Sequence, residues 1–339
     1  MTRLNILLLQ LKRIGDLILT TPAIAALREK FPDAKLTLVV SPECAELLPA
    51  IPDIDNRLVV NSAKNWLQIA RGKFDYCIDF TRNDRSAFLV FLSRAKKRIV
   101  SFRIRVRSRV RTRVYNEFVE HRMRDMHTAD YHLALLEPLG ISNASPAIRL
   151  ELPLVAREKA DQLRKNYKVD KRFIIFHPGS ARAEKFWETQ RWAEVIGHAG
   201  RDHNIDLVLT GGASASEQAH LAEIKSKLER RFVDLSGKTD LLTLVALIGQ
   251  ARLLVTVDSG PMHLAAATRT PQVVLFGPTN PFHWRPRESP ALILQGTSTS
   301  PMTEFAPKQA RVPMKQISTE AVIDAMDALL SAPAAQPAL

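Results

Sequence analysis

The residues best suited to binding an anion lie between two apolar runs in the C-terminal half. The run Leu253–Val257 ends in Asp258-Ser259-Gly260-Pro261, and an alanine-rich stretch of helical pattern leads to a second run, Gln272–Phe276. This order predicts strand, turn, helix and strand, with free N–H groups at the helix start where a phosphate could bind. Asp258 and His263 add a carboxylate and an imidazole. An ordinary βα turn with a capping Asp or Ser explains the same residues equally well.

A second turn of this kind occurs upstream. The predicted strand 172–177 ends in Pro178-Gly179-Ser180, and Lys185 follows in the same loop. The backbone N–H groups of both turns could point at a pyrophosphate, and a nearby lysine would stabilise a departing diphosphate. Two such turns in one half of the chain predict a nucleotide-diphosphate site there.

The other candidate catalytic group is a carboxylate near the N-terminus. Gln10–Asp16 separates a predicted first strand, residues 5–9, from a helical stretch, residues 17–31. Asp16 lies at or next to the start of this helix and could accept a proton from an acceptor hydroxyl. A carboxylate is also favoured there because it faces free N–H groups. The residues alone support both interpretations.

Basic residues are concentrated in one segment. The formal net charge is +13, and residues 94–113 contain ten basic and no acidic side chains. The arginines at 103, 105, 107, 109, 111 and 113 fall on every second position. This spacing predicts an extended segment with all six on one face, with a mobile loop as the alternative. Such a face could bind phosphates or an anionic membrane, or it could be a solvated charge run. Few aromatic residues occur here, so nucleic acid is a weaker candidate.

Several common sites are missing from the sequence. There is no G-x-G-x-x-G or P-loop motif, and no group of His, Cys and carboxylates at metal-ligand spacing. Asp53-Ile-Asp55 has the form of a metal-binding D-x-D, but its turn-like surroundings favour a solvated loop. The only two cysteines, Cys44 and Cys77, are expected to be small core residues of a protein in a reducing compartment. No apolar stretch approaches the ~20 residues of a membrane span.

Strands and helices alternate through both halves of the chain, with short turns between them. This pattern predicts an α/β protein with two doubly wound, Rossmann-like domains that face each other across a cleft, where a ligand is expected. The predicted domains are residues 1–170 and 171–317. A C-terminal helix, 318–331, is expected to pack back toward the N-terminal domain, and 332–339 to be a disordered tail. Residues 296–315 are expected to form a loop.

The motifs occur in an order that resembles glycosyltransferase family 9, the ADP-heptose:lipopolysaccharide heptosyltransferases. The resemblance covers residues 3 to about 330 and rests on the following segments: Arg13-Ile-Gly-Asp16 with Thr21-Pro22, His177-Pro-Gly-Ser180 with Lys185 and Trp187, Gly211-Gly212 with Glu217, Ser236-Gly237, and Val257-Asp-Ser-Gly-Pro-Met-His263 with Phe276-Gly-Pro-Thr279. It implies a GT-B fold, with the acceptor bound by the N-terminal domain and the nucleotide sugar by the C-terminal one. It also implies an inverting transfer that needs no metal or cofactor, with ADP-heptose as donor substrate.

The resemblance also implies roles for individual residues. Asp16 matches the proposed general base, and Lys185 the cation beside the leaving diphosphate. Glu217 resembles an acidic residue that contacts the ribose of the donor. Thr239 lies at the position where family members approach the nucleotide base of the donor. The implied donor-binding set is Gly179, Ser180, Lys185, Glu217, Thr239, Asp258, Ser259, Gly260 and His263. Many relatives have a cysteine cluster in the segment corresponding to 296–315, and its absence here leaves the subfamily open.

The implied acceptor supplies a partner for the arginines. Lipopolysaccharide inner core carries phosphates and carboxylates, and it is assembled on the cytoplasmic face of the inner membrane of Gram-negative bacteria. The resemblance therefore implies a cytoplasmic enzyme that associates peripherally with this anionic membrane, without nucleic acid. The implied acceptor-binding residues are Arg13, Arg82, Arg85, Arg103 and Arg105. Two alternatives stay open: a family member with another nucleotide-activated sugar donor, and a non-catalytic nucleotide-binding protein with a basic nucleic-acid-binding patch.

Overall fold

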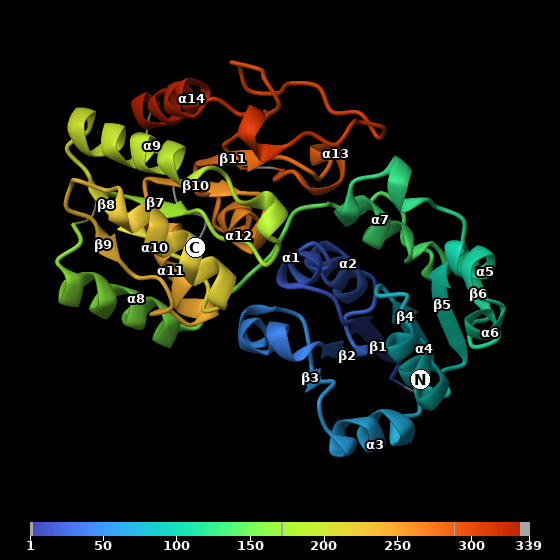
Figure 1. Cartoon of the computed structure of the whole chain (residues 1–339). Coiled ribbons are helices and arrows are strands. Elements are labelled where there is room, and N and C mark those ends of the chain that lie inside the picture. The colour runs from blue at the N-terminus through green and yellow to red at the C-terminus, as the bar shows by residue number, and fades with distance from the viewer. Residues whose placement is uncertain (1–2, 171, 288, 333–339) are drawn as a thin grey trace. The chain divides into compact units, whose positions relative to one another are not determined.

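The two halves of the chain form two compact α/β units in the computed structural model (Figure 1). The structure describes residues 3–170, 172–287 and 289–332. The units divide between Glu151 and Leu152, upstream of the predicted boundary at residue 170. The difference arises because helix α8 (Leu154–Tyr167) contacts α11 (Leu241–Gln250) and so belongs to the second unit. Of the predicted tail, residues 333–339 lie outside the described residues.

Unit 1 is built on a parallel six-stranded sheet with the strand order β3-β2-β1-β4-β5-β6. The inner strands are almost continuously apolar and buried, as expected where helices cover both faces of a parallel sheet. Its elements are β1 (Asn5–Gln10), α1 (Ile14–Ile18), α2 (Thr21–Lys30), β2 (Lys35–Val40), η1 (Pro42–Ala50), β3 (Asn56–Val59), α3 (Ala63–Arg71), β4 (Tyr76–Asp79), α4 (Asp84–Ser93), β5 (Lys97–Ser101), α5 (Arg103–Arg107), α6 (Arg109–Thr112), β6 (Glu117–Val119), η2 (Met123–Asp125), α7 (Thr128–Ala134) and η3 (Glu137–Leu139).

Unit 2 repeats this plan with the strand order β12-β11-β10-β7-β8-β9, again all parallel. Besides α8 and α11, its elements are β7 (Phe173–His177), η4 (Ala183–Lys185), α9 (Thr189–Asp202), β8 (Asp206–Leu209), α10 (Ala215–Ser226), β9 (Val233–Asp234), β10 (Leu253–Val257), α12 (Gly260–Thr268), β11 (Gln272–Phe276), α13 (Pro281–Trp284), β12 (Ala291–Gln295), η5 (Met314–Gln316) and α14 (Thr319–Ser331). The predicted pair of doubly wound parallel sheets is therefore confirmed.

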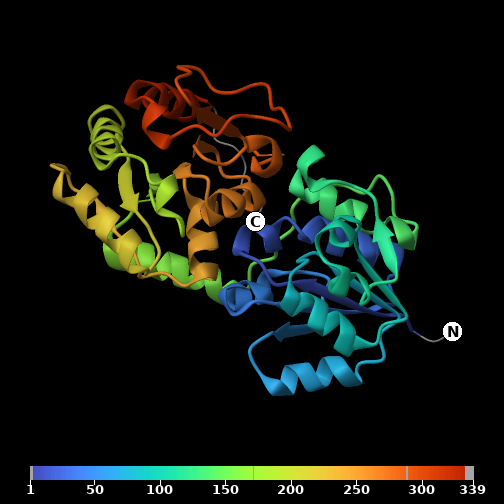
Figure 2. The same ribbon diagram turned by 45° about the vertical axis from the view of Figure 1, so that its right-hand side comes forward.

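Helices cover both faces of the sheet in unit 2 (Figures 1 and 2). On one face α9 contacts α10 and α14, and on the other α11 contacts α8 and α12. Helix α14 buries Val322, Ala325 and Met326 in the core of this unit, together with Trp187 and Trp192. Helix α14 therefore belongs to unit 2, where its apolar side is buried.

Helix ends follow local chemistry. Pro22 splits the predicted helix 17–31 into α1 and α2, and it occupies the first turn of α2, where no N–H bond is lost. Ser318 Oγ accepts from the Ala321 N–H, as the sequence predicts for the start of α14. Gly140, with a φ of +71°, ends η3 in the left-handed conformation that favours glycine.

The arginine-rich segment is helical and not extended. It forms the short helices α5 and α6, so the prediction that its alternate arginines share one extended face is wrong. The adjacent strand position is taken by β6, which pairs with β5. Ile104 is buried, whereas Val106 is 78% exposed. The alternation of arginine with other residues in this segment therefore does not come from a strand with one buried and one exposed face.

Candidate functional site

The strand order of unit 2 changes direction between β7 and β10. The chain builds β7, β8 and β9 to one side and then returns to add β10, β11 and β12 on the other. At such a switch point the turns after the two central strands diverge and leave a crevice at their carboxyl ends, where ligands bind in doubly wound sheets. Both candidate phosphate-binding turns, at 178–180 and 258–260, follow these two strands.

A buried ion pair joins the two turns. Lys185 Nζ lies 2.6 Å from Asp258 Oδ2 and donates to the Asp258 carbonyl oxygen at 2.8 Å. The two side chains are only 11% and 7% exposed. Thr279, in the turn after β11, donates its hydroxyl hydrogen to the same carboxylate. Because an ammonium group has three N–H donors, these two bonds fix the position of Lys185 and account for two of its donors.

Glu217 determines the shape of the glycine turns beside this pair. Its side chain is buried, and its Oε1 accepts from the Gly212 N–H at 2.7 Å. A Cβ atom added at Gly179 would lie 1.8 Å from the same oxygen, so only glycine allows this approach. His177 Nδ1 lies 3.0 Å from Thr210 Oγ1. Burial lowers the pKa of His177 to about 4, so a neutral imidazole lies beneath these turns at neutral pH.

Helix α12 begins directly after Asp258. Ser259 is its N-cap residue but makes no side-chain cap bond to any residue that the structure describes. The Met262 N–H donates to the Ser259 carbonyl oxygen at 3.2 Å and Pro261 has no N–H, so the Gly260 N–H is the candidate first-turn donor to an anion. His263, one turn into the helix, is buried. Ser180 is buried and accepts from the Arg182 N–H at 3.3 Å.

The turns after β8 and β9 are connected to each other. Gly237 N–H donates to the Gly211 carbonyl oxygen at 2.9 Å, and Gln218 Nε2 donates to Gly212 O at 2.6 Å. Thr239 follows this connection and is half-buried just before α11. Unit 2 therefore brings the predicted donor-binding residues to the turns at one edge of its sheet.

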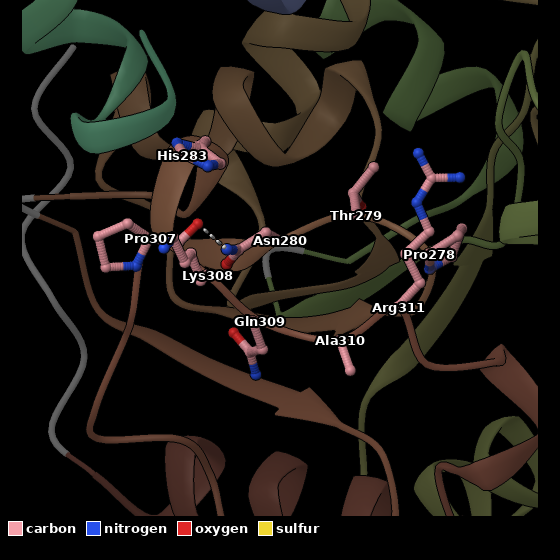
Figure 3. Close-up of a pocket in the computed structure, with 9 residues that line it drawn as sticks. All are labelled: Pro278, Thr279, Asn280, His283, Pro307, Lys308, Gln309, Ala310 and Arg311. Atoms are coloured by element: carbon pink, nitrogen blue, oxygen red, sulfur yellow. Dashed lines mark hydrogen bonds between the residues drawn. The ribbon is translucent and has the colours of Figure 1, made fainter. Parts of the chain in front are cut away.

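A pocket of about 610 Å³ lies next to Thr279 (Figure 3). One side is the turn after β11, and the other is the segment 307–311 of the loop that the sequence left without a role. Asn280 Nδ2 connects the two sides by donating to Ala306 O and Pro307 O at 2.9 and 3.2 Å. Lys308 and Arg311 give the lining positive charge. Only the fold could identify them, because nothing in their local sequence indicates a site.

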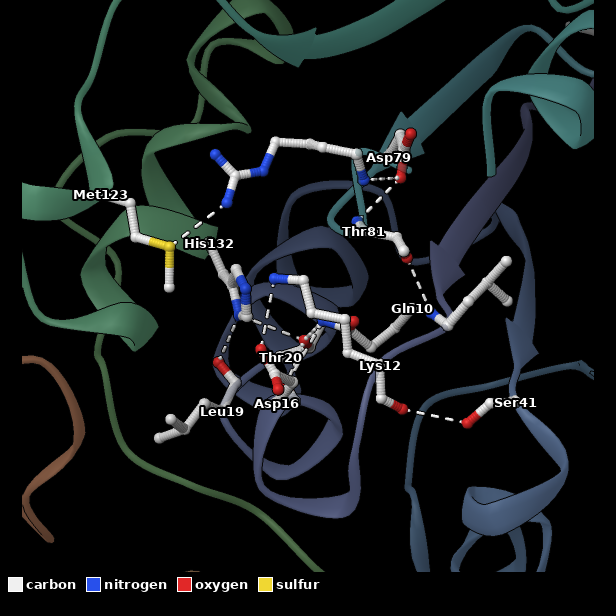
Figure 4. Close-up of polar contacts among 12 residues, drawn as sticks. Gln10, Lys12, Asp16, Leu19, Thr20, Ser41, Asp79, Thr81, Met123 and His132 are labelled. Atoms are coloured by element: carbon white, nitrogen blue, oxygen red, sulfur yellow. Dashed lines mark hydrogen bonds and ion pairs between the residues drawn. The ribbon is translucent and has the colours of Figure 1, made fainter. Parts of the chain in front are cut away.

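The predicted base of unit 1 also lies at a switch point, because β1 and β4 are the strands at which the order reverses. Asp16 is in the first turn of α1, with a side chain 14% exposed. Lys12 Nζ lies 3.3 Å from Asp16 Oδ1 (Figure 4). The Lys12 carbonyl oxygen accepts from Ser41 Oγ at 3.0 Å and from Cys44 Sγ at 3.3 Å. The sequence reasoning missed Lys12, although its spacing of four residues from Asp16 is a recognisable signal.

A buried polar network supports the backbone of Asp16. Thr20 Oγ1 donates to the Asp16 carbonyl oxygen at 2.8 Å and accepts from Gln10 Nε2 at 2.8 Å. His132 Nδ1 lies 3.0 Å from Leu19 O, which can only accept, so the hydrogen is on Nδ1. Burial lowers the pKa of His132 to about 3, with Lys12 adding to the effect, which keeps the ring neutral. Its Nε2 has no hydrogen-bond partner among the described residues.

Two of the predicted acceptor arginines belong to one basic cluster. Burial lowers the pKa of Arg103, and the neighbouring charges of Arg107, Arg82 and Arg124 lower it further. The guanidinium of Arg82 lies 4.9 Å from the centre of the Tyr131 ring, in α7. Arg103, Arg107 and Arg124 are exposed, and Arg124 Nε lies 3.5 Å from Asp125 Oδ1, so solvent and this carboxylate offset part of the repulsion.

The other predicted acceptor residues have different surroundings. Arg105 packs over Phe118, with 3.9 Å from its guanidinium carbon to the ring centre. Arg13 and Arg85 are exposed. In the D-x-D segment, Asp55 Oδ2 accepts from Arg28 Nη2 at 2.7 Å and from the Leu36 N–H at 2.8 Å. That aspartate is therefore part of the scaffold of unit 1.

Comparison with known proteins identifies the family. The model of glycosyltransferase family 9 (heptosyltransferase) matches residues 63–312. Lipopolysaccharide heptosyltransferase 3 of Escherichia coli (strain K12) is 28% identical over 285 residues, which cover 80% of this chain and 82% of the relative.

Solved structures show the same fold. The glycosyl transferase family 9 protein of Veillonella parvula DSM 2008 has a TM-score of 0.81 at 26% identity, covering 96% of this chain and 97% of that one. E. coli ADP-heptose lps heptosyltransferase II has a TM-score of 0.79 at 21% identity, covering 96% and 98%. The predicted GT-B type of fold is confirmed. The chain belongs to glycosyltransferase family 9 and is a glycosyltransferase.

Proposed function

We propose that this glycosyltransferase moves heptose from ADP-heptose to an acceptor in the lipopolysaccharide core. The names of its relatives support this choice, since they include a lipopolysaccharide heptosyltransferase and an ADP-heptose heptosyltransferase. The observation that carries the proposal is the buried Lys185–Asp258 pair at the switch point of unit 2. It presents a fixed cation between two glycine turns, where a nucleoside diphosphate would leave.

In this mechanism the ADP diphosphate lies against the turns 178–180 and 258–260. The remaining N–H donor of Lys185 and the start of α12 stabilise the charge that develops on the leaving diphosphate. A preorganised ammonium group can provide the charge that a divalent metal provides in other enzymes, which is consistent with metal-independent transfer. The pocket beside Thr279 has a volume suited to a small ligand. We assign it to the transferred sugar.

Asp16 is the proposed general base. Its carboxylate takes the proton of the acceptor hydroxyl while that oxygen bonds to the anomeric carbon and the bond from this carbon to ADP breaks. Attack from the face opposite the leaving group inverts the configuration. Two contacts support the role: Lys12 Nζ lies 3.3 Å from the Asp16 carboxylate, and Thr20 Oγ1 holds the Asp16 backbone through its carbonyl oxygen.

The basic cluster of Arg82, Arg103, Arg107 and Arg124 is the proposed contact for phosphates or carboxylates of the acceptor. Guanidinium groups suit such ligands because they bind them in a bidentate manner. Arg13 and Arg85 remain candidate contacts at the exposed rim. Arg105 is a weaker candidate, since its guanidinium packs on Phe118.

An exposed apolar patch supports attachment to a membrane surface. No helix among residues 3–170, 172–287 and 289–332 is long and apolar enough to span a bilayer. Helices α3 and α4 nevertheless expose Trp66, Leu67, Phe88 and Phe91, the last at 66%. Aromatic side chains insert into the headgroup region, and basic residues attract anionic lipid. We propose that this patch and the arginine-rich segment dock the enzyme on the inner membrane.

The decisive experiment is mass spectrometry of truncated lipopolysaccharide acceptors after incubation with the enzyme and ADP-heptose. A gain of one heptose supports both donor and acceptor, and its absence with every acceptor would refute the proposal. Calorimetry with ADP-heptose, GDP-sugars and UDP-sugars separates this function from that of a family member with another donor. Asp16→Asn should fold and bind ADP but lose transfer, and unchanged turnover would exclude Asp16 as the base.

A further inference from the structure

Three potential metal ligands converge between α9 and α14, outside the site described above. His198 is in α9, His203 follows its last residue, and Asp327 is in α14. His203 Nε2 lies 2.8 Å from Asp327 Oδ1, and His198 Nε2 lies 3.0 Å from Asp327 Oδ2. One ligand atom from each residue lies within 4.8 Å of the others. We propose that these three side chains bind Zn²⁺ or a chemically similar divalent transition-metal ion.

The ligand set suits such an ion. Imidazole nitrogen and carboxylate oxygen bind Zn²⁺ at about 2.0–2.2 Å, which places neighbouring tetrahedral ligand atoms about 3.4 Å apart. The nitrogen–oxygen separations here are 2.8–3.2 Å. A movement of roughly 0.2–0.6 Å between these side chains would therefore make room for the ion.

A second carboxylate orients one of the histidines. Asp202 Oδ2 lies 2.8 Å from His198 Nδ1, on the side of the ring away from Asp327. Metal-ligating histidines commonly donate their other N–H to a carboxylate, which fixes the tautomer with a lone pair on the ligating nitrogen. Each ring nitrogen of His198 faces a carboxylate, but a neutral imidazole has one N–H. With a metal ion bound to Nε2 and to Asp327, the N–H would be on Nδ1 and would donate to Asp202.

The exposure of the group allows an ion to enter. The side chains of His198, His203 and Asp327 are 19%, 19% and 36% exposed. Water can therefore supply the fourth ligand of a tetrahedral site. The sequence showed no metal-ligand spacing because Asp327 is 124 residues away from His203.

The location of the group indicates a structural role for the ion. Lys185 precedes α9 at the carboxyl edge of the sheet, whereas His203 follows α9 and leads into β8 at Asp206. The group therefore lies at the edge opposite the proposed donor site. An ion there would link α9 to α14, whose Val322 and Met326 are part of the core of unit 2. It would stabilise the unit without contacting reacting atoms.

The test uses the full chain without a histidine tag, after removal of metal with EDTA and dialysis. Calorimetric titration with ZnCl₂ should show one ion per chain. At about 100 times Kd, free Zn²⁺ should raise Tm by roughly 5–10 °C. Co²⁺ should give the intense visible bands of a tetrahedral site. His203→Gln and Asp327→Asn should each weaken binding at least about tenfold, and Asp202→Asn roughly tenfold or more.

His121→Gln is the matched control, because His121 also pairs with a carboxylate, Glu137, but lies in unit 1. It should leave Zn²⁺ affinity unchanged. The Co²⁺ spectrum of the unsubstituted protein keeps the proposal testable if a variant folds poorly. The proposal is overturned if neither Zn²⁺ nor Co²⁺ binds the unsubstituted chain. It is also overturned if Zn²⁺ affinity is the same in His203→Gln, Asp327→Asn and the original protein.

Discussion

Replacing Lys185 by methionine should both destabilise unit 2 and slow glycosyl transfer. The substitution preserves much of the side-chain volume but removes the charge that lies 2.6 Å from Asp258 Oδ2. The carboxylate would then remain buried, with the Thr279 hydroxyl as its neighbouring donor. Leaving one partner of a buried pair uncompensated costs about 3–5 kcal/mol. That is a large fraction of the roughly 5–15 kcal/mol by which domains are stable.

Urea unfolding followed by circular dichroism and tryptophan fluorescence measures this loss, because Trp187 and Trp192 are buried in unit 2. Adding Asp258→Asn to Lys185→Met should recover part of the stability, with a coupling of about 1–3 kcal/mol in the double-mutant cycle. Lys96→Met is the control. Lys96 Nζ lies 2.8 Å from Asp75, but its side chain is 79% exposed, so its loss should have little effect.

The kinetic consequence follows from the proposed role of Lys185 at the leaving diphosphate. Loss of one fixed donor to a developing negative charge typically lowers kcat by about 10²–10³. At saturating donor and acceptor, Lys185→Met should show this decrease under conditions in which it is folded. A stability loss below about 1 kcal/mol, additive effects in the double variant and an unchanged kcat would together refute the reasoning.

Three further predictions follow from the two units. Gly179→Ala should lower ADP affinity, measured by calorimetry, because the new Cβ would meet Glu217 Oε1 at 1.8 Å. Unaltered affinity would show that Glu217 can move at no cost to the site. Arg103→Gln should raise the acceptor KM and reduce its salt dependence. Arg105→Gln should have a smaller effect on both, because that side chain packs on Phe118; equal effects of the two would contradict the proposed cluster. Because burial lowers the pKa of His177 to about 4, the unfolded chain takes up a proton near pH 6.5 that the folded chain does not. As the pH is lowered from 6.5 to 4, this residue should therefore decrease the free energy of unfolding by about 1.4 kcal/mol per pH unit. Urea unfolding across this pH range measures the decrease, and His177→Gln should remove the contribution of this residue.

Local features of the fold were predictable because their causes are local. Apolar runs such as Leu253–Val257 form parallel strands buried on both faces, and the residues after them form turns whatever their distant neighbours are. Gly140, Pro22 and Ser318 mark helix ends through their own backbone or side-chain chemistry. For the same reason the candidate turns at 178–180 and 258–260 were recognisable from their own residues.

Errors arose where tertiary contacts decide between local alternatives. Arginine has a high helix propensity, so an arginine-rich segment can be helical as well as extended. Residues 103–113 cannot pair with β5 on the side that β6 occupies, so no strand pairing holds them extended there. Helices α8 and α14 are amphipathic segments that can cover any apolar surface. Their places against α11 and α9 depend on which surfaces the rest of unit 2 leaves open.

The sequence by itself determined the class of fold, the order of its strands along the chain and the turns at their ends, since these depend on hydrophobic period and turn chemistry over a few residues. Only the tertiary structure decided which distant groups meet. Lys185 and Asp258 are 73 residues apart, and His203 and Asp327 are 124 apart. Residues so far apart in the chain become neighbours only through the arrangement in which parallel strands and their helices assemble, and no local pattern records that arrangement.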